Sequence, residues 1–262
     1  MFTRDRMQTI GIGVAGFAIT IALWWIIAET VLASSQIPTP PEIIDVFRER
    51  GWDYYQRIFS ITLREALRGY LVGVVLALVT ATLVLLVPFV EPIVMQFAVI
   101  TYCLPIVVLA PILITVHDIP IKGGLSPTAV DLAAVSVFFT TVVGAILGFR
   151  QVDKSALDVV EVYGGSRFQQ FRRVRLVSAL PAIFTTLQIA APAAFLGALL
   201  GEYFDRHLEI GVGPSLILSQ NNRETALAWS LGIGCAVVSG LAYIVLGLIG
   251  RAIAPWSKGE AA

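Results

Sequence analysis

Charged residues are scarce in this chain of 262 residues, making up 14% of it, whereas 57% of the residues are hydrophobic. Soluble domains are closer to half apolar and a quarter charged. The formal net charge is zero, so the charge balance does not support binding to nucleic acid. The composition therefore indicates an integral membrane protein.

Residue types that build catalytic and metal sites are also scarce. The two cysteines, Cys103 and Cys235, lie inside apolar runs and are expected to be buried thiols rather than a disulfide or metal ligands. His117 and His207 are far apart, with no Cys or His at ligand spacing. The chain contains no G-x-x-x-x-G-K-[ST] phosphate loop, no G-x-S-x-G, no H-E-x-x-H and no paired-carboxylate motif. We therefore expect no catalytic residue, no metal site and no cofactor, and no enzymatic activity.

Long apolar runs are what the chain does contain, and there are six of them between charged residues. A helix needs about 20 residues to cross roughly 30 Å of hydrocarbon. We therefore predict an all-α, polytopic membrane protein formed by a single transmembrane domain over residues 1–262. The six predicted spans cover residues 7–32, 62–87, 92–116, 127–149, 177–202 and 225–250.

The distribution of basic residues predicts the orientation. Arg4 and Arg6 precede the first span, and a further six Lys and Arg residues lie between residues 150 and 175. Cytoplasmic loops carry an excess of Lys and Arg. We therefore expect a multi-pass protein of the cell (plasma, or inner) membrane with both termini in the cytoplasm.

The segment between the first two spans, residues 34–60, begins with several prolines. Beyond them, apolar side chains recur at roughly helical spacing, which predicts an amphipathic helix lying on the outer surface of the bilayer. Such a helix serves equally well as a packing lid between spans or as a docking surface for a soluble partner.

Prolines interrupt two predicted spans, Pro105 and Pro111 in the third and Pro192 in the fifth. Broken helices of this kind line pathways in transporters, but they also occur in ordinary bundle packing. Buried charge is nearly absent, since Glu29, Asp131 and Glu202 stand at or near run ends, and this disfavours an ion-driven carrier. The candidate pathway residues are Thr101, Tyr102, Pro105, Thr140, Thr141, Gln188 and Glu202.

Glycines four residues apart occur in three predicted spans, as Gly69/Gly73, Gly144/Gly148 and Gly197/Gly201. Small residues at this spacing let helix backbones approach closely in a membrane. The spacing predicts a tightly packed multi-helix bundle.

The most polar stretch, residues 156–181, lies between two long apolar runs. It predicts a short helix from Asp158 to Tyr163 that Gly164 and Gly165 end, followed by four arginines mixed with apolar residues. The stretch is too charged to cross a bilayer, so it must lie on a membrane face. It is either a solvated basic loop or a surface that receives mechanical work from a cytoplasmic partner.

This stretch resembles the cytoplasmic loop of bacterial ABC importer permeases, the inner-membrane components of binding-protein-dependent transport systems. Asp158-Val159-Val160 stands at the Glu-Ala-Ala position of that loop, Gly164 at its glycine, and Leu180-Pro181 at its closing Leu-Pro. The resemblance extends to IPTPPEII after the first span, TLREALRGYLVGVVLAL in the second, GVGPSLI near the fifth and the final Pro255-Trp256. The chain departs from the family pattern in having Asp-Val-Val for Glu-Ala-Ala and Glu161 where arginine is common.

The resemblance implies a permease subunit that works with two ABC ATPase subunits, an extracytoplasmic solute-binding protein and a second permease subunit, most simply a copy of itself. Within this family, the chain is most similar to the branch that imports sulfonates, taurine, nitrate or pyrimidine-type precursors. A standalone ion-driven carrier or channel and a non-transporting membrane scaffold are the alternatives. The residues that the resemblance assigns to ATPase coupling are Asp158, Val159, Val160, Glu161, Tyr163, Gly164, Gly165, Ser166, Phe168 and Phe171.

Overall fold

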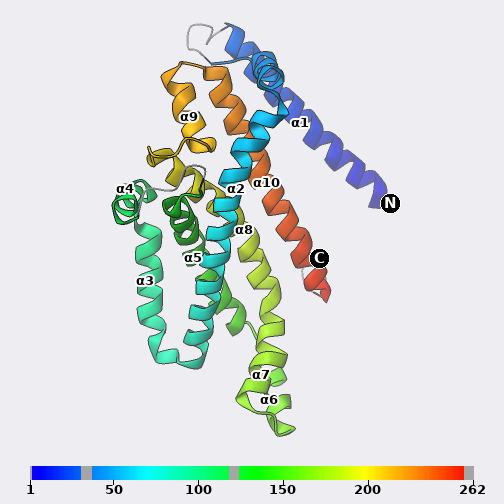
Figure 1. Ribbon diagram of the computed structural model, residues 1–262. Coiled ribbons are helices and arrows are strands. Elements are labelled where there is room, and N and C mark those ends of the chain that lie inside the picture. Colours follow the sequence, from blue (N-terminus) through cyan, green and yellow to red (C-terminus); the bar gives the residue numbers. More distant parts are fainter. Residues whose placement is uncertain (1, 31–36, 118–123, 257–262) are drawn as a thin grey trace. The chain divides into compact units, whose positions relative to one another are not determined.

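The computed structural model describes residues 2–30, 37–117 and 124–256, and helices are the only regular elements in these ranges (Figure 1). The all-α fold expected from the sequence is confirmed. In order, the elements are α1 (Phe2–Thr30), α2 (Pro40–Leu86), the 3₁₀ turn η1 (Pro88–Val90), α3 (Glu91–Cys103), α4 (Ile106–Val116), α5 (Pro127–Arg150), α6 (Lys154–Val162), α7 (Arg167–Gln170), the π-helical turn η2 (Phe171–Arg175), α8 (Leu176–Phe204), α9 (Val212–Asn221) and α10 (Thr225–Ile253). The predicted end of the first span, at residue 32, lies outside the described residues.

Five of the described helical segments are long and apolar enough to cross a membrane: residues 11–30 of α1, α2, α5, the segment 167–204 that includes α8, and α10. The α3–α4 pair meets the same criterion when it is taken together, although the two helices meet at 96°. The described chain therefore has five candidate spans, or six if this bent pair is one span.

The bend between α3 and α4 is explained by Pro105. Leu104 and Pro105 both adopt extended backbone angles, with ψ near 120°, where a continuous helix would require about −40°. Proline disfavours the helical conformation of the residue before it and offers no N–H for the helical ladder. Pro111, in contrast, lies inside α4 without ending it. One of the two prolines expected to bend the third span therefore breaks it.

Helix α2 departs from the sequence prediction. We expected an amphipathic surface helix up to about residue 60 and a separate span from residue 62. The structure instead shows two helical segments that meet at a kink at Gly51, where φ is +74°, and the second segment continues to Leu86. No glycine or proline lies between Gly51 and Gly69, so the helix has no local reason to stop near residue 60.

The chain packs as two units, residues 1–56 with 215–234 and residues 57–214 with 235–262. In the first unit, the rings of Trp24 and Trp229 stack with centroids 5.3 Å apart. The buried Tyr55 hydroxyl lies 2.7 Å from the Ser230 hydroxyl oxygen, and Arg50 donates to Glu224 over 2.8 Å. These contacts join segments that are far apart in the sequence.

In the second unit, α5 packs against both α2 and α8, and it shares its most extensive contact with α8. A Cβ atom added at Gly73 would lie 2.5 Å from the Ala134 carbonyl oxygen, and one at Gly197 would lie 2.6 Å from the Leu132 carbonyl oxygen. Both glycines therefore allow their helices to contact the α5 backbone directly.

The other glycines of the three pairs serve the same purpose. Gly69 of α2 and Gly201 of α8 face α5, and Gly144 and Gly148 of α5 face Thr186 and Ala179 of α8. The core between them consists largely of buried alanines, including Ala133 and Ala194. The close helix packing predicted from glycine spacing is therefore confirmed at all three pairs.

We predict that Gly201→Val destabilises the protein. A Cβ atom at position 201 would lie 2.8 Å from the Ala129 nitrogen and 3.1 Å from its Cβ atom, so α5 and α8 would have to separate. Overpacking of this kind costs about 1–3 kcal/mol. The measurement is the melting temperature of the purified protein in detergent.

Gly240→Val is the matched control, because Gly240 is also a helical glycine but its added Cβ atom meets nothing within 4 Å. If the Gly201→Val protein had the same melting temperature as the Gly240→Val control, the proposed packing would be contradicted.

Candidate functional site

Helix α6 has well-defined signals at both ends. At its start, Asp153 is the N-cap, and its Oδ1 accepts a hydrogen bond from the Ser155 nitrogen over 3.0 Å. Hydrogen bonds from the side chain and backbone of Ser155 lower the pKa of Asp153 below its ordinary value. The helix thus begins at Lys154, earlier than predicted, and Asp158 lies within it rather than near its N-terminus.

The end of α6 is a glycine turn. Gly164 has φ of +74°, its nitrogen donates to the Glu161 carbonyl over 2.8 Å, and the Gly165 nitrogen donates to the Val160 carbonyl over 2.8 Å. This pattern satisfies the last carbonyls of the helix through a left-handed residue. The helix stop predicted at Gly164 and Gly165 therefore lies where the sequence placed it, with Tyr163 as the C-cap.

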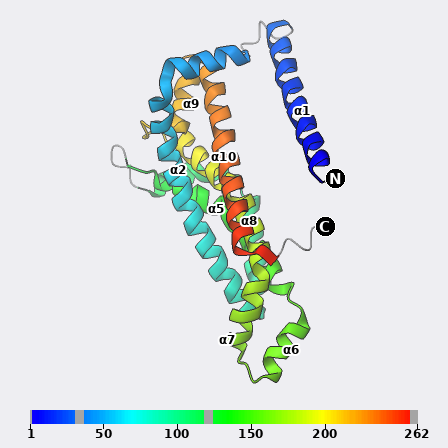
Figure 2. The ribbon, with the colours of Figure 1, turned by 90° about the vertical axis from the view of Figure 1, so that its right-hand side faces the viewer.

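A second helix start follows the turn at once. The Ser166 Oγ accepts from the Gln169 nitrogen over 3.3 Å, and the Gln169 side chain accepts from the Ser166 nitrogen over 2.8 Å. This reciprocal capping box begins α7, which passes through η2 into α8. Residues 154–170 thus form a helical hairpin, called the α6–α7 hairpin below, that projects beyond the end of α8 (Figure 2).

The α6–α7 hairpin exposes large apolar side chains although it is the most polar part of the chain. Val162 and Tyr163 at the end of α6 are 83% and 88% exposed, and Phe168 is 68% exposed. Val159, Asp158 and Glu161 are exposed beside them, whereas Val160 and Gly165 are half-buried. Exposed apolar groups gathered on one segment are typical of a protein-interaction site.

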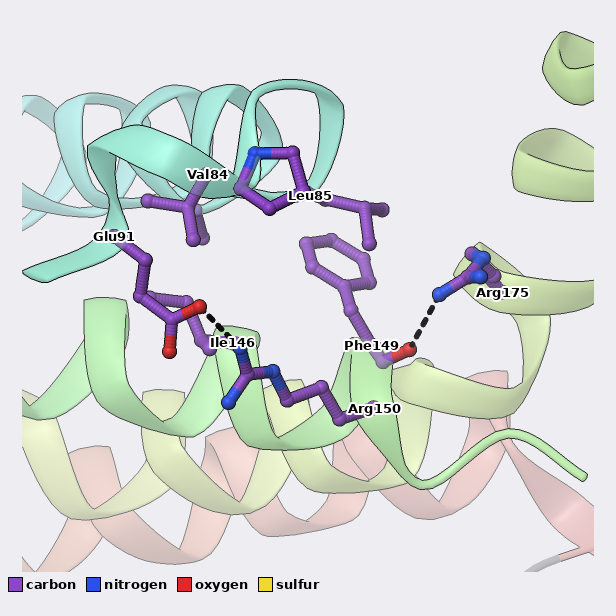
Figure 3. A pocket seen from close by; sticks show the side chains of 9 residues that line it. Val84, Leu85, Glu91, Ile146, Phe149, Arg150 and Arg175 are labelled. Atoms are coloured by element: carbon purple, nitrogen blue, oxygen red, sulfur yellow. Dashed lines mark hydrogen bonds and ion pairs between the residues drawn. The ribbon is translucent and has the colours of Figure 1, made fainter.

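The base of the hairpin is held by contacts that surround a pocket of about 190 Å³ (Figure 3). The Arg175 guanidinium donates to the Phe149 carbonyl over 3.5 Å, and the rings of Phe149 and Phe171 lie 5.8 Å apart. On the other side of the pocket, Arg150 forms an ion pair with Glu91. The two ends of the hairpin are thereby tied to each other and to the start of α3, so a displacement of the hairpin would act on α3, α5 and α8 together.

The candidate pathway residues come from three helices and from the break between α3 and α4. Thr101, Tyr102 and Pro105 lie on α3 and at its break with α4, Thr140 and Thr141 on α5, and Gln188 and Glu202 on α8. None of them lines the pocket in Figure 3. The structure therefore does not gather them around that pocket.

The candidate pathway residues differ in their exposure and in their contacts. Tyr102 is 68% exposed, and its ring stacks on Phe139 at 4.5 Å. Thr101 donates to the Ala98 carbonyl, and Gln188 packs against Gly247. Thr140 is half-buried, whereas Thr141 and Glu202 are fully buried.

Sequence reasoning missed two buried carboxyl groups, those of Glu65 and Asp205, so the expectation that buried charge is nearly absent is wrong. Glu65 stands between exposed Arg64 and Arg68, yet its own side chain is fully buried, close to Glu202. A usable signal was present, because Thr62, Glu65, Gly69 and Gly73 recur at helical spacing on the face that packs against α5 and α8.

Comparison with known proteins places this architecture in one family. The model of the family described as binding-protein-dependent transport system inner membrane component matches residues 73–258. The formylaminopyrimidine transport permease protein ThiX of Halalkalibacterium halodurans is 25% identical over 208 residues, covering 78% of this chain and 80% of that protein. The riboflavin transport system permease protein RibX of Chloroflexus aurantiacus is 24% identical, covering 58% of this chain and 54% of that protein.

The fold also has a counterpart among solved structures. A crystal structure described as an amino acid ABC transporter with histidines covers 82% of this chain and 94% of its own, with a TM-score of 0.56 and 12% identity. At this identity the likeness concerns the fold alone.

We predict that the acid stability of α6 depends on Asp153. Because its pKa is lowered in the folded protein, the stabilising contribution is complete above the ordinary Asp value of about 3.9 and is lost as the pH falls through the lowered value. Asp153→Ala should speed amide hydrogen exchange in α6 of the full-length protein at neutral pH.

Asp153→Asn is the control, because Asn is an equally good cap that does not titrate. It should keep slow exchange at neutral pH and abolish the acid-induced increase. Identical exchange in wild type and Asp153→Ala would contradict the capping role.

Proposed function

Because the chain belongs to the family of binding-protein-dependent transport system inner membrane components, we propose that it is the permease subunit of an ATP-driven importer that docks on its ATPase through the α6–α7 hairpin. The observation that carries this proposal is the exposed apolar surface at Val162, Tyr163 and Phe168, on a hairpin whose base is tied to three helices. The family is one of transport subunits, so ATP hydrolysis is assigned to a separate subunit.

The coupling follows from the shape of the hairpin. A short helix docked in a groove of the partner transmits rigid-body motion if it cannot bend at its own base. The Arg150–Glu91 ion pair and the Arg175–Phe149 contact restrain this base. The proposed contact residues on the hairpin and at its base are Asp158, Val159, Val160, Glu161, Tyr163, Gly164, Gly165, Ser166, Phe168 and Phe171.

We propose six spans, with the bent α3–α4 pair counted as one. Both termini and the α6–α7 hairpin then lie in the cytoplasm, as the arginines around the hairpin favour. A solute-binding protein would dock on the opposite face, and a second permease subunit, most simply another copy of this chain, would complete the pathway.

For the solute, we favour a small, planar nitrogen heterocycle of the pyrimidine-precursor type over a sulfonate, taurine or nitrate. Two relatives are named for transport of formylaminopyrimidine and riboflavin, both of which contain such rings. The exposed Tyr102 ring, stacked on Phe139 beside the Pro105 break, offers an aromatic surface against which a planar ring can stack. The candidate lining residues are Thr101, Tyr102, Pro105, Thr140, Thr141, Gln188 and Glu202.

Affinity purification of the tagged protein from its native membrane in mild detergent tests the proposed assembly. We expect an ABC ATPase subunit in near-equal amount, identified by mass spectrometry. A binding protein recovered with the complex would carry its ligand, which mass spectrometry can identify. A preparation without an ATPase would favour a standalone carrier or channel, or a membrane scaffold, and would overturn the proposal.

We further predict that Gly164→Leu inserts and folds but no longer stimulates the ATPase. A Cβ atom at position 164 meets nothing within 4 Å, so a larger side chain projects outward, where the partner is proposed to dock. The left-handed backbone adds a strain of roughly 1–2 kcal/mol for most residues. The measurement is ATPase activity of the reconstituted complex with and without solute-loaded binding protein.

Gly164→Asn distinguishes the effect of side-chain size from that of backbone strain, since Asn tolerates the left-handed conformation. It should retain more stimulation than Gly164→Leu. Normal solute-stimulated activity in the Leu variant would show that this position has no coupling role.

A further inference from the structure

Two glutamates lie buried in the packed part of the second unit. Glu65 of α2 and Glu202 of α8 are each fully buried. Glu202 accepts a hydrogen bond from Thr62, which stands less than one helical turn before Glu65, so the two glutamates are close neighbours. They are separated by more than a hundred residues in the sequence. Glu202 is a candidate pathway residue, but the proposed transport function assigns no role to Glu65 or to the pair.

Glu202 is already supplied with hydrogen-bond donors. Its Oε1 accepts from the Thr62 hydroxyl over 2.7 Å, and its Oε2 accepts from the Gly213 nitrogen over 2.8 Å. The Gly211–Gly213 turn can approach because it lacks side chains at both ends: a Cβ atom at Gly211 or Gly213 would lie 2.6 Å or 2.5 Å from atoms of Glu202. Glu202 therefore has a donor at each oxygen, as an ionised carboxylate requires.

Glu65 has a hydrogen-bond donor at only one of its two carboxyl oxygens. Its Oε1 accepts from the Ser126 nitrogen over 2.6 Å, but its Oε2 is buried and has no hydrogen-bond partner. An ionised carboxylate with an unpartnered buried oxygen is costly. A protonated Oε2, in contrast, would itself be a donor, and the adjacent Glu202 is an acceptor.

Within the part of the chain that the structure describes, no cation offsets the charge, because neither glutamate forms an ion pair with Arg or Lys. The titratable groups around them are Asp205 at the end of α8, which accepts from the Ser126 hydroxyl, His207, which contacts Asp205, and Cys235 of α10. Asp205 adds negative charge, so two adjacent ionised glutamates would face a third acid without compensation.

We propose that Glu65 and Glu202 form a buried proton-binding site, in which one proton on Glu65 Oε2 is donated to the Glu202 carboxylate. The shared proton joins α2 to the end of α8. Through Ser126, Thr62 and Gly213 it also connects these helices to the start of α5 and to the start of α9. Four segments are thereby held together at one point by a single titratable proton.

The test uses the purified protein in detergent and needs neither an ATPase nor a solute. Infrared spectroscopy at neutral pH distinguishes the carbonyl stretch of a protonated carboxyl group from the bands of a carboxylate. We expect the wild type to show a protonated-carboxyl band that Glu65→Gln removes. Glu49→Gln is the control, because Glu49 is an exposed glutamate of the same helix, and it should leave the band unchanged.

The melting temperature provides a second readout. If Glu65 acted only as a negative charge, Glu65→Gln would be as destabilising as Glu65→Ala. The side-chain amide introduced by Glu65→Gln can donate to Glu202 as the proton does, so the melting temperature of this variant should lie within about 2 °C of wild type. Glu65→Ala removes the donor and should melt lower by roughly 5 °C or more.

Three results would overturn the proposal: identical carboxyl bands in wild type and Glu65→Gln, a Gln variant as unstable as the Ala variant, or a wild-type stability that requires added Na⁺ or K⁺. The last would place a metal cation where we place the proton. None of these readouts involves transport. Their outcome is therefore independent of whether the proposed importer function is correct.

Discussion

The direct backbone contact of α5 with α2 and α8 is the constraint on which the second unit depends. In a membrane, helices gain no hydrophobic force by leaving lipid for one another, so close van der Waals packing supplies much of the association. Gly73 and Gly197 remove the side chains that would hold these helices away from α5. The same α5–α8 pair continues into the two ends of the α6–α7 hairpin, at Arg150 and Arg175, so the rigidity of the bundle extends to the hairpin.

Departures from regular helix occur where the sequence supplies a reason. Pro105 breaks α3 from α4, Gly51 interrupts α2, and Gly164 ends α6 in a left-handed turn. Each break redirects the chain without leaving it unstructured, because a new helix begins within a few residues. In a transport subunit, such breaks allow a short surface hairpin and a bent span to coexist with a rigid helix pair.

Much of this could be predicted because it depends on local chemistry. Apolar run length predicts helices in a membrane, glycine spacing predicts close contacts, and Gly164-Gly165 predicts a helix end. The start of α6 at Lys154 was missed, although Asp153 is an N-cap residue and Ser166-x-x-Gln169 is a capping-box pattern. The uninterrupted helix from Gly51 to Leu86 was missed because an amphipathic pattern was taken as a separate surface helix. Of the apolar residues in that pattern, Ile43 and Tyr55 are buried, whereas Ile44, Phe47 and Trp52 are exposed.

The sequence by itself determined the membrane class, the helical content, the family resemblance and the glycine contacts, because run length, spacing and motif are properties of neighbouring residues. Only the tertiary structure decided that α3 and α4 meet at 96°, that Arg175 and Phe149 join the ends of the hairpin, and that Glu65 is buried beside Glu202. The burial of Glu65 could not be deduced from its exposed neighbours Arg64 and Arg68. It depends on partners that α5, α8 and the turn at Gly213 bring from distant parts of the chain.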